Sequence, residues 1–135
     1  MRFEHIRYAR FEKTVLGFIP VNGRKTILIL EDYDEMVDPG FYHLVPHDGI
    51  KFKNTWALVG AEASHFPEPG IEKSTCLLHG GDTHEDTTGC LITGHSFHFV
   101  DSTPDIDGAA QAMELIRELL AKDVPHYINI TERFK

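Results

Sequence analysis

Residues 13–30, KTVLGFIPVNGRKTILIL, carry the strongest signal for the fold of this chain. Two apolar runs, at 13–21 and 26–30, flank the dipeptide Asn22-Gly23. Asn-Gly between two strand-like runs favours a tight hairpin, because both residues readily adopt the positive φ angles of a type I′ turn. The stretch therefore predicts two antiparallel strands joined by a two-residue turn.

Further short strands are predicted on both sides of this hairpin. Runs rich in β-branched and aromatic residues, bounded by Gly, Pro, Asp or Asn, are typical of strands. They lie at 2–10, 41–45, 55–59, 74–79, 90–93, 96–100 and 126–131. We find no repeat and no linker, so the sequence predicts one mainly antiparallel β domain over residues 1–135.

One helix is expected near the C-terminus, at about 104–122. Thr103 is a suitable N-cap and Pro104 suits the first helical position, while Asp105 and Asp107 would complement the positive end of the helix dipole. An apolar face follows at helical spacing, formed by Ala109, Ala112, Met113, Ile116, Leu119 and Leu120. The fold class is therefore mainly β with a single packed helix.

Charge and composition exclude several classes of protein. The formal net charge of −8 over 135 residues argues against a nucleic-acid partner and against adsorption to anionic membranes. No apolar run approaches the roughly 20 residues of a membrane span. The charged start at 1–5 lacks a signal-peptide core, so we expect a protein that is cytoplasmic at synthesis. Two cysteines cannot build a disulfide framework, and we expect both thiols to be free.

His79 and Cys90 are the candidate catalytic residues. Each stands beside a short apolar run, and a polar Gly/Asp/Thr loop joins them. Neighbouring strands could bring this imidazole and this thiol face to face, as a nucleophilic cysteine with a basic partner requires. We therefore expect the two side chains within hydrogen-bond reach or one water apart, facing a pocket walled by residues 80–89.

Other interpretations of the same residues stay open. Cys90 could be a small buried residue in a tight turn, and His79 could bond only to the loop backbone. A metal site with Asp82, His84, Glu85 and Asp86 is disfavoured because no ligand spacing supports it, so we expect no metal and no cofactor. The acidic run at 31–35 predicts a solvated hairpin end, although Glu31 could point into the site.

The cysteine region resembles an uncharacterised family of small phage and bacterial domains that is distantly similar to the L,D-transpeptidase catalytic domain. The pattern reads Leu78-His79-Gly80-Gly81-Asp82, then Asp86-Thr87-Thr88-Gly89-Cys90-Leu91-Ile92-Thr93-Gly94. Upstream, Ile29-Leu30-Glu31 and Pro39-Gly40-Phe41-Tyr42 match the family in the same order. The resemblance covers about residues 7–120 and implies a β-sandwich or barrel with one packed helix.

The resemblance also implies a chemistry and a partner. Cys90 would attack a carbonyl of a peptidoglycan stem peptide, with His79 as base and Asp86 orienting His79. Backbone around Gly89, with Thr88 and Gly80, would bind the substrate or the developing oxyanion. For a phage-encoded protein, the cell wall would be reached through lysis or in a virion.

This sequence departs from the L,D-transpeptidase motif Ser-His-Gly-Cys-x-Arg. Thr88 stands at the position of the histidine and Ile92 at the position of the arginine. Three functions therefore remain open: a cysteine transpeptidase or hydrolase acting on stem peptides, an inactive module that binds virion or host proteins, and a cytoplasmic amidase or peptidase acting on a small substrate.

Overall fold

The computed structural model describes residues 1–49, 53–60, 76–81, 83, 89–99, 103–122 and 124–134. These residues form ten strands and one helix, so the predicted mainly β class is confirmed. The elements are β1 (Arg2–Phe11), β2 (Thr14–Ile19), β3 (Ile27–Asp32), β4 (Gly40–His47), β5 (Thr55–Gly60), β6 (Leu78–His79), β7 (Leu91–Gly94), β8 (Ser96–His98), β9 (Asp105–Asp107), α1 (Ala109–Leu119) and β10 (His126–Glu132).

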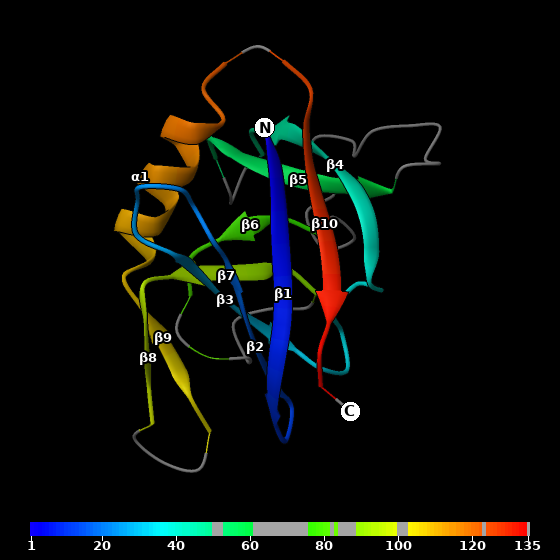
Figure 1. Cartoon of the computed structure of the whole chain (residues 1–135), viewed down its shortest axis with the longest axis vertical. Coiled ribbons are helices and arrows are strands. Elements are labelled where there is room, and N and C mark those ends of the chain that lie inside the picture. The colour runs from blue at the N-terminus through cyan, green and yellow to red at the C-terminus, as the bar shows by residue number, and fades with distance from the viewer. Residues whose placement is uncertain are drawn as a thin grey trace.

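Eight strands make one strongly curved sheet in the order β5-β4-β10-β1-β2-β3-β7-β6 (Figure 1). Most neighbours are antiparallel, but β1 pairs with β10 and β6 pairs with β7 in parallel. The two ends of the sheet also meet. Ala57 forms an isolated bridge with Leu77, and the Leu58 N–H donates to the Cys76 carbonyl at 2.8 Å. The sheet is therefore a nearly closed barrel.

The predicted hairpin forms, but residues 20–26 join its strands in place of the predicted two-residue turn, and Asn22 does not have the positive φ of a type I′ turn. β2 and β3 pair antiparallel, with Ile19 opposite Ile27 at the turn end. The Arg24 N–H donates to the Val21 carbonyl at 3.2 Å across Asn22-Gly23, and Gly23 has φ 69°. The positive φ is the conformation that makes glycine favourable at this turn position.

The start of the helix is a correction to the sequence prediction. α1 begins at Ala109, after the left-handed Gly108 (φ 85°), so Thr103 is not its N-cap. Asp105 and Asp107 lie instead in β9, which pairs antiparallel with β8. The reason is burial: Ile106 is 2% exposed and packs in a small outer core with Leu16, Leu30 and Ile92. Burying Ile106 outweighs the local capping preference of the residues around it.

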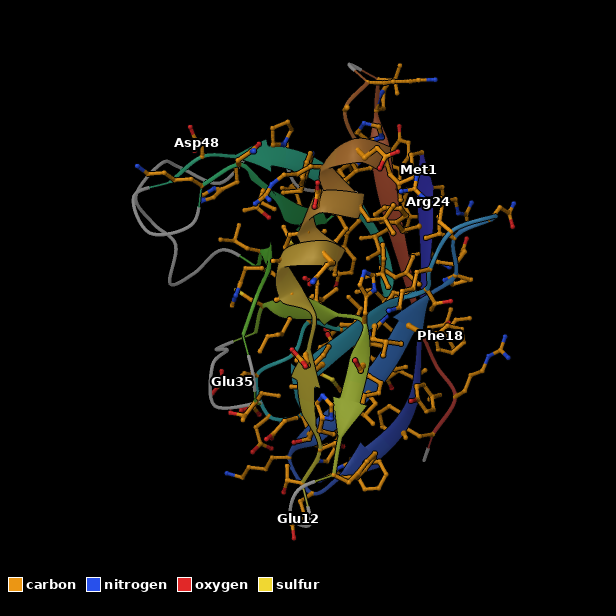
Figure 2. All side chains as sticks on the ribbon, turned by 90° about the vertical axis from the view of Figure 1, so that its left-hand side faces the viewer. Met1, Glu12, Phe18, Arg24, Glu35 and Asp48 are labelled. Atoms are coloured by element: carbon orange, nitrogen blue, oxygen red, sulfur yellow. The ribbon has the colours of Figure 1, made fainter. Side chains whose placement is uncertain are left out.

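The interior of the barrel changes from apolar to charged along its axis. Inward positions of β1 run Phe3, His5, Arg7, and those of β3 run Ile27, Ile29, Glu31. The apolar part packs against the buried face of α1, formed by Ala112, Met113, Leu115 and Ile116 (Figure 2). The barrel therefore has an apolar region beside α1 and a charged region toward the opposite end.

Candidate functional site

His79 and Cys90 lie on neighbouring parallel strands. His79 is the last residue of β6, and Cys90 immediately precedes β7. In the register His79 is opposite Ile92, and the Leu91 N–H donates to the Leu77 carbonyl at 2.9 Å. Cys90 is therefore next to Leu77 and two positions from His79. Two residues along and one strand across correspond to roughly 8 Å between Cα atoms.

The two side chains share the outer face of the barrel. Leu78 and Leu91 point into the main core, so by strand alternation their neighbours point outward. Cys90 packs with Ala57 and Leu77, and is 6% exposed. The fold thus places the imidazole and the thiol on one face of adjacent strands, and the predicted hydrogen-bond reach between them stays a prediction.

The tautomer of the neutral His79 ring follows from its backbone contact. Its Nδ1 lies 2.6 Å from the Gly80 carbonyl oxygen, and the side chain is 6% exposed. A carbonyl oxygen can only accept, so Nδ1 carries the proton. In the neutral ring the lone pair then lies on Nε2, which can act as a base.

The two cysteines have different surroundings. The Cys90 Sγ accepts a hydrogen bond from the Leu77 N–H at 3.4 Å. A thiolate at this position could accept the same hydrogen bond. Cys76 faces the barrel interior and donates from its Sγ to the Gly89 carbonyl at 3.1 Å. Burial raises the pKa of Cys76 well above its ordinary value, and Cys90 and Glu31 raise it further. Neither cysteine forms a disulfide, and Cys76 is a neutral thiol at physiological pH.

Gly80 and Gly89 are required by close approaches of the backbone. Gly89 has φ 124°, and a Cβ there would lie 2.8 Å from the Glu35 carbonyl oxygen. A Cβ on Gly80 would lie 2.9 Å from the Cβ of Ala109, at the start of α1. Asp86 and Thr88, predicted to orient His79 and to contact substrate, lie outside the described residues.

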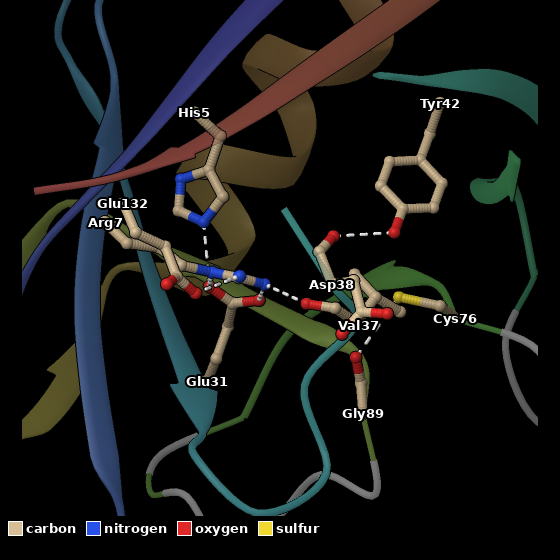
Figure 3. Close-up of polar contacts among 9 residues, drawn as sticks. All are labelled: His5, Arg7, Glu31, Val37, Asp38, Tyr42, Cys76, Gly89 and Glu132. Carbon is tan, nitrogen blue, oxygen red and sulfur yellow. Dashed lines mark hydrogen bonds and ion pairs between the residues drawn. The ribbon is translucent and has the colours of Figure 1, made fainter. Parts of the chain in front are cut away.

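A buried ionic cluster that the sequence analysis missed occupies the charged region of the barrel (Figure 3). Arg7 binds Glu31 through two hydrogen bonds, from Nε to Oε2 at 2.9 Å and from Nη2 to Oε1 at 2.8 Å. The His5 Nε2 lies 2.8 Å from Glu31 Oε2, and Arg7 Nη1 donates to Glu132 Oε1 at 2.9 Å. His5, Arg7 and Glu31 are each 0% exposed. The expectation of a solvated hairpin end is therefore wrong for Glu31.

Pairing keeps this cluster ionised despite its burial. Burial by itself would raise the pKa of Glu31, but His5 and Arg7 together lower it from 4.5 to about 2. Burial opposes the charge on Arg7, yet its two carboxylate partners raise its pKa. Buried charges are tolerated when partners replace the lost water in this way. Glu31 and Arg7 are therefore fixed charges at neutral pH.

The cluster is connected to the backbone beside Cys90. Arg7 Nη2 also donates to the Val37 carbonyl at 2.8 Å, which ties down the segment after β3. Glu35, in the same segment, places its carbonyl against Gly89. Strand alternation in β1, with His5 and Arg7 on the same face as Phe3, was the available sequence signal. It was ambiguous because charged residues on an alternating strand normally mark the solvent side.

Comparison with protein families, with curated proteins and with solved structures found no match. In the described part of the chain, no group of three histidine, cysteine or acidic residues is arranged to hold a metal ion. No helix among these residues is long and apolar enough to cross a membrane. The described residues form a nearly closed β barrel with a buried ionic cluster inside and with His79 and Cys90 on its outer face.

Proposed function

We propose that this protein is a cysteine-dependent acyl-transfer enzyme that acts on peptide stems of peptidoglycan, by transpeptidation or hydrolysis. The observation that carries the proposal is the Nδ1 contact between His79 and the Gly80 carbonyl. It leaves Nε2 as the basic nitrogen of a histidine that shares a sheet face with Cys90. The resemblance of the 78–94 stretch to transpeptidase-like domains supports the substrate class.

The reaction would proceed in two acyl-transfer steps. The Cys90 thiol gives its proton to His79 Nε2, and the sulfur attacks the substrate carbonyl carbon. The tetrahedral intermediate collapses to a thioester, and the departing amine takes the proton from His79. An incoming amine or water then attacks the thioester, which forms a new amide or an acid and returns the proton to Cys90. Backbone N–H groups near Gly89 would stabilise the oxyanion.

Purified muropeptides test this proposal directly. The protein is incubated with tetrapeptide and pentapeptide stems, and the products are identified by mass spectrometry. We expect cross-linked or shortened stems, a thioester adduct on Cys90, and neither in a Cys90→Ala variant. A Cys76→Ala variant is the matched control and should retain activity. Turnover that survives Cys90→Ala would refute the proposal.

A second candidate function is a binding module without catalysis, directed at virion or host proteins. Its specific support is the burial of Cys90, which packs with Ala57 and Leu77 and is 6% exposed. A buried cysteine in an apolar cluster is commonly a small packing residue.

Turnover of simple amides without turnover of muropeptides would instead support an amidase or peptidase acting on small substrates.

A further inference from the structure

A pocket of about 520 Å³ lies next to the charged region of the barrel, between the segment after β3 and the end of β10. We call it the barrel-mouth pocket. Its apolar lining includes Met36, Val37, Pro39 and Phe134. The mouths of β-barrels are frequent ligand sites, and volumes of about 300–1,000 Å³ are typical of such sites. The pocket is therefore large enough for an extended side chain and its flanking backbone.

Carboxylates stand on two sides of the barrel-mouth pocket. Asp34 and Asp38 come from the segment after β3, and Glu132 ends β10. In the described part of the chain, no lysine or arginine lines the pocket. A ligand bound here would therefore meet one sign of charge beside an apolar wall.

Cations close to the pocket compensate this negative charge only in part. The Arg10 guanidinium lies over the ring of the lining residue Tyr33, at 3.4 Å from the ring centroid. Arg7 Nη1 contacts Glu132 from inside the barrel, and the Glu132 side chain remains 29% exposed. Lys13 Nζ lies 3.5 Å from Asp34 Oδ2, but both side chains are more than half exposed. Such an exposed pair is weak and exchanges readily with another cation. The Tyr42 hydroxyl donates to the backbone carbonyl of Asp38 and not to its carboxylate.

We infer that the barrel-mouth pocket binds the side chain of a lysine or arginine presented by a peptide. The methylene stem would pack on Met36, Val37 and Phe134, and the cationic end would pair with Asp34, Asp38 and Glu132. A polyamine fits less well, because it carries charges every few carbons and would place a second ammonium against the apolar wall. This site is independent of the proposed chemistry at Cys90.

The test is an NMR titration of the isotope-labelled full chain with acetyl-Ala-Lys-Ala-amide. The matched probe replaces lysine with norleucine, which keeps the aliphatic stem and removes the ammonium. We expect the lysine peptide to shift amide signals of residues 33–39 and 132–134, and the norleucine peptide to bind at least about fivefold more weakly. Raising NaCl to 0.5 M should weaken binding of the lysine peptide.

Variants separate local from general electrostatics. Asp34→Asn combined with Asp38→Asn should weaken binding of the lysine peptide about fivefold or more. Lys13→Met should strengthen it, because the competing ammonium is removed. Glu12→Gln is the control: it removes one exposed carboxylate that does not line the pocket, and binding should not change.

Four results would overturn the inference. Equal binding of the norleucine peptide would show that the pocket recognises only the apolar stem of the side chain. Tighter binding of spermidine than of the lysine peptide would make it a polyamine site. The same shifts with calcium chloride alone would make it an inorganic cation site. Weakening by Glu12→Gln as large as that of the double variant would show a general charge effect.

Discussion

The barrel interior and its outer face hold two polar sites of opposite character. Inside, Arg7 and Glu31 are fully buried and are joined by two charge-assisted hydrogen bonds of 2.8 and 2.9 Å. Outside, the Cys90 Sγ accepts a long hydrogen bond of 3.4 Å from the Leu77 N–H, and part of the neighbouring loop lies outside the described residues. Several hydrogen bonds fix the geometry of the interior site, whereas the placement of the outer pair depends on strand register and on two glycines.

The two sites differ in how their polar groups can act. A buried carboxylate bound by Arg7 and His5 has no proton to give near neutral pH. His79 has one nitrogen held by a carbonyl and a second that can be basic. We propose that the interior cluster positions the backbone and that His79 and Cys90 are reactive, and the following predictions test that proposal.

The largest effect is expected from Arg7→Met. The substitution leaves the Glu31 carboxylate buried beside His5 alone and frees the Val37 carbonyl, so we expect a loss of about 3–5 kcal/mol in the free energy of unfolding. Urea denaturation followed by circular dichroism measures it. Arg2→Met is the matched control on the same strand, because the Arg2 side chain is 58% exposed, and it should change little. Similar losses in both variants would remove the distinction between the two sites.

Acid should act mainly on the interior site. The folded-state pKa of Glu31 lies at about 2, below its ordinary 4.5, so its ionised form stabilises the fold above pH 4.5. That contribution, roughly 3 kcal/mol, should be lost as the pH falls from 4.5 to 2. Urea unfolding at a series of pH values gives the profile. In Glu31→Gln this part of the pH dependence should disappear, and an unchanged profile would contradict the assignment.

Gly89→Ala tests how the two sites are joined. A side chain at φ 124° is strained, and its Cβ would clash with the Glu35 carbonyl, so we expect a loss of about 2 kcal/mol in stability. Gly60→Ala is the control, since a Cβ there meets nothing within 4 Å. If both variants unfold at the same urea concentration, the approach of Glu35 to Gly89 does not constrain the backbone beside Cys90.

The smallest effect on stability, and the most direct test of reactivity, is expected at the outer pair. Iodoacetamide should alkylate Cys90 faster than Cys76, although Cys76 is the more exposed of the two, because desolvation raises the pKa of Cys76 and keeps it protonated. His79→Ala should slow the reaction at Cys90 and shift its pH–rate profile upward, at a cost of about 1 kcal/mol in stability. Peptide mass spectrometry measures both rates.

His98→Ala is the control for that experiment, because His98 is half exposed and pairs with Asp107. It should leave the alkylation rate of Cys90 unchanged. Equal rates at the two cysteines, with no response to His79→Ala, would favour the binding-module function.

Much of the fold could be predicted because its signals are local. Asn22-Gly23 between two apolar runs predicts a hairpin from neighbouring residues alone. The strands β1, β4, β5 and β10 follow in the same way from short β-branched and aromatic runs. The helix start was wrong for the opposite reason. Thr103 and Pro104 form a good local capping signal, but Ile106 is drawn into a core made by three distant strands.

The sequence by itself determined the mainly β class, the hairpin and the candidate pair His79 and Cys90, since alternation, turn chemistry and residue type act over a few neighbours. Only the tertiary structure decided that β6 and β7 run parallel, that the sheet nearly closes, and that Arg7 and Glu31 face inward. Strand alternation separates the residues of a strand into two faces, but it does not indicate which face is buried. That choice depends on which partners, here His5, Glu132 and the Val37 carbonyl, arrive from elsewhere in the chain to satisfy the buried charges.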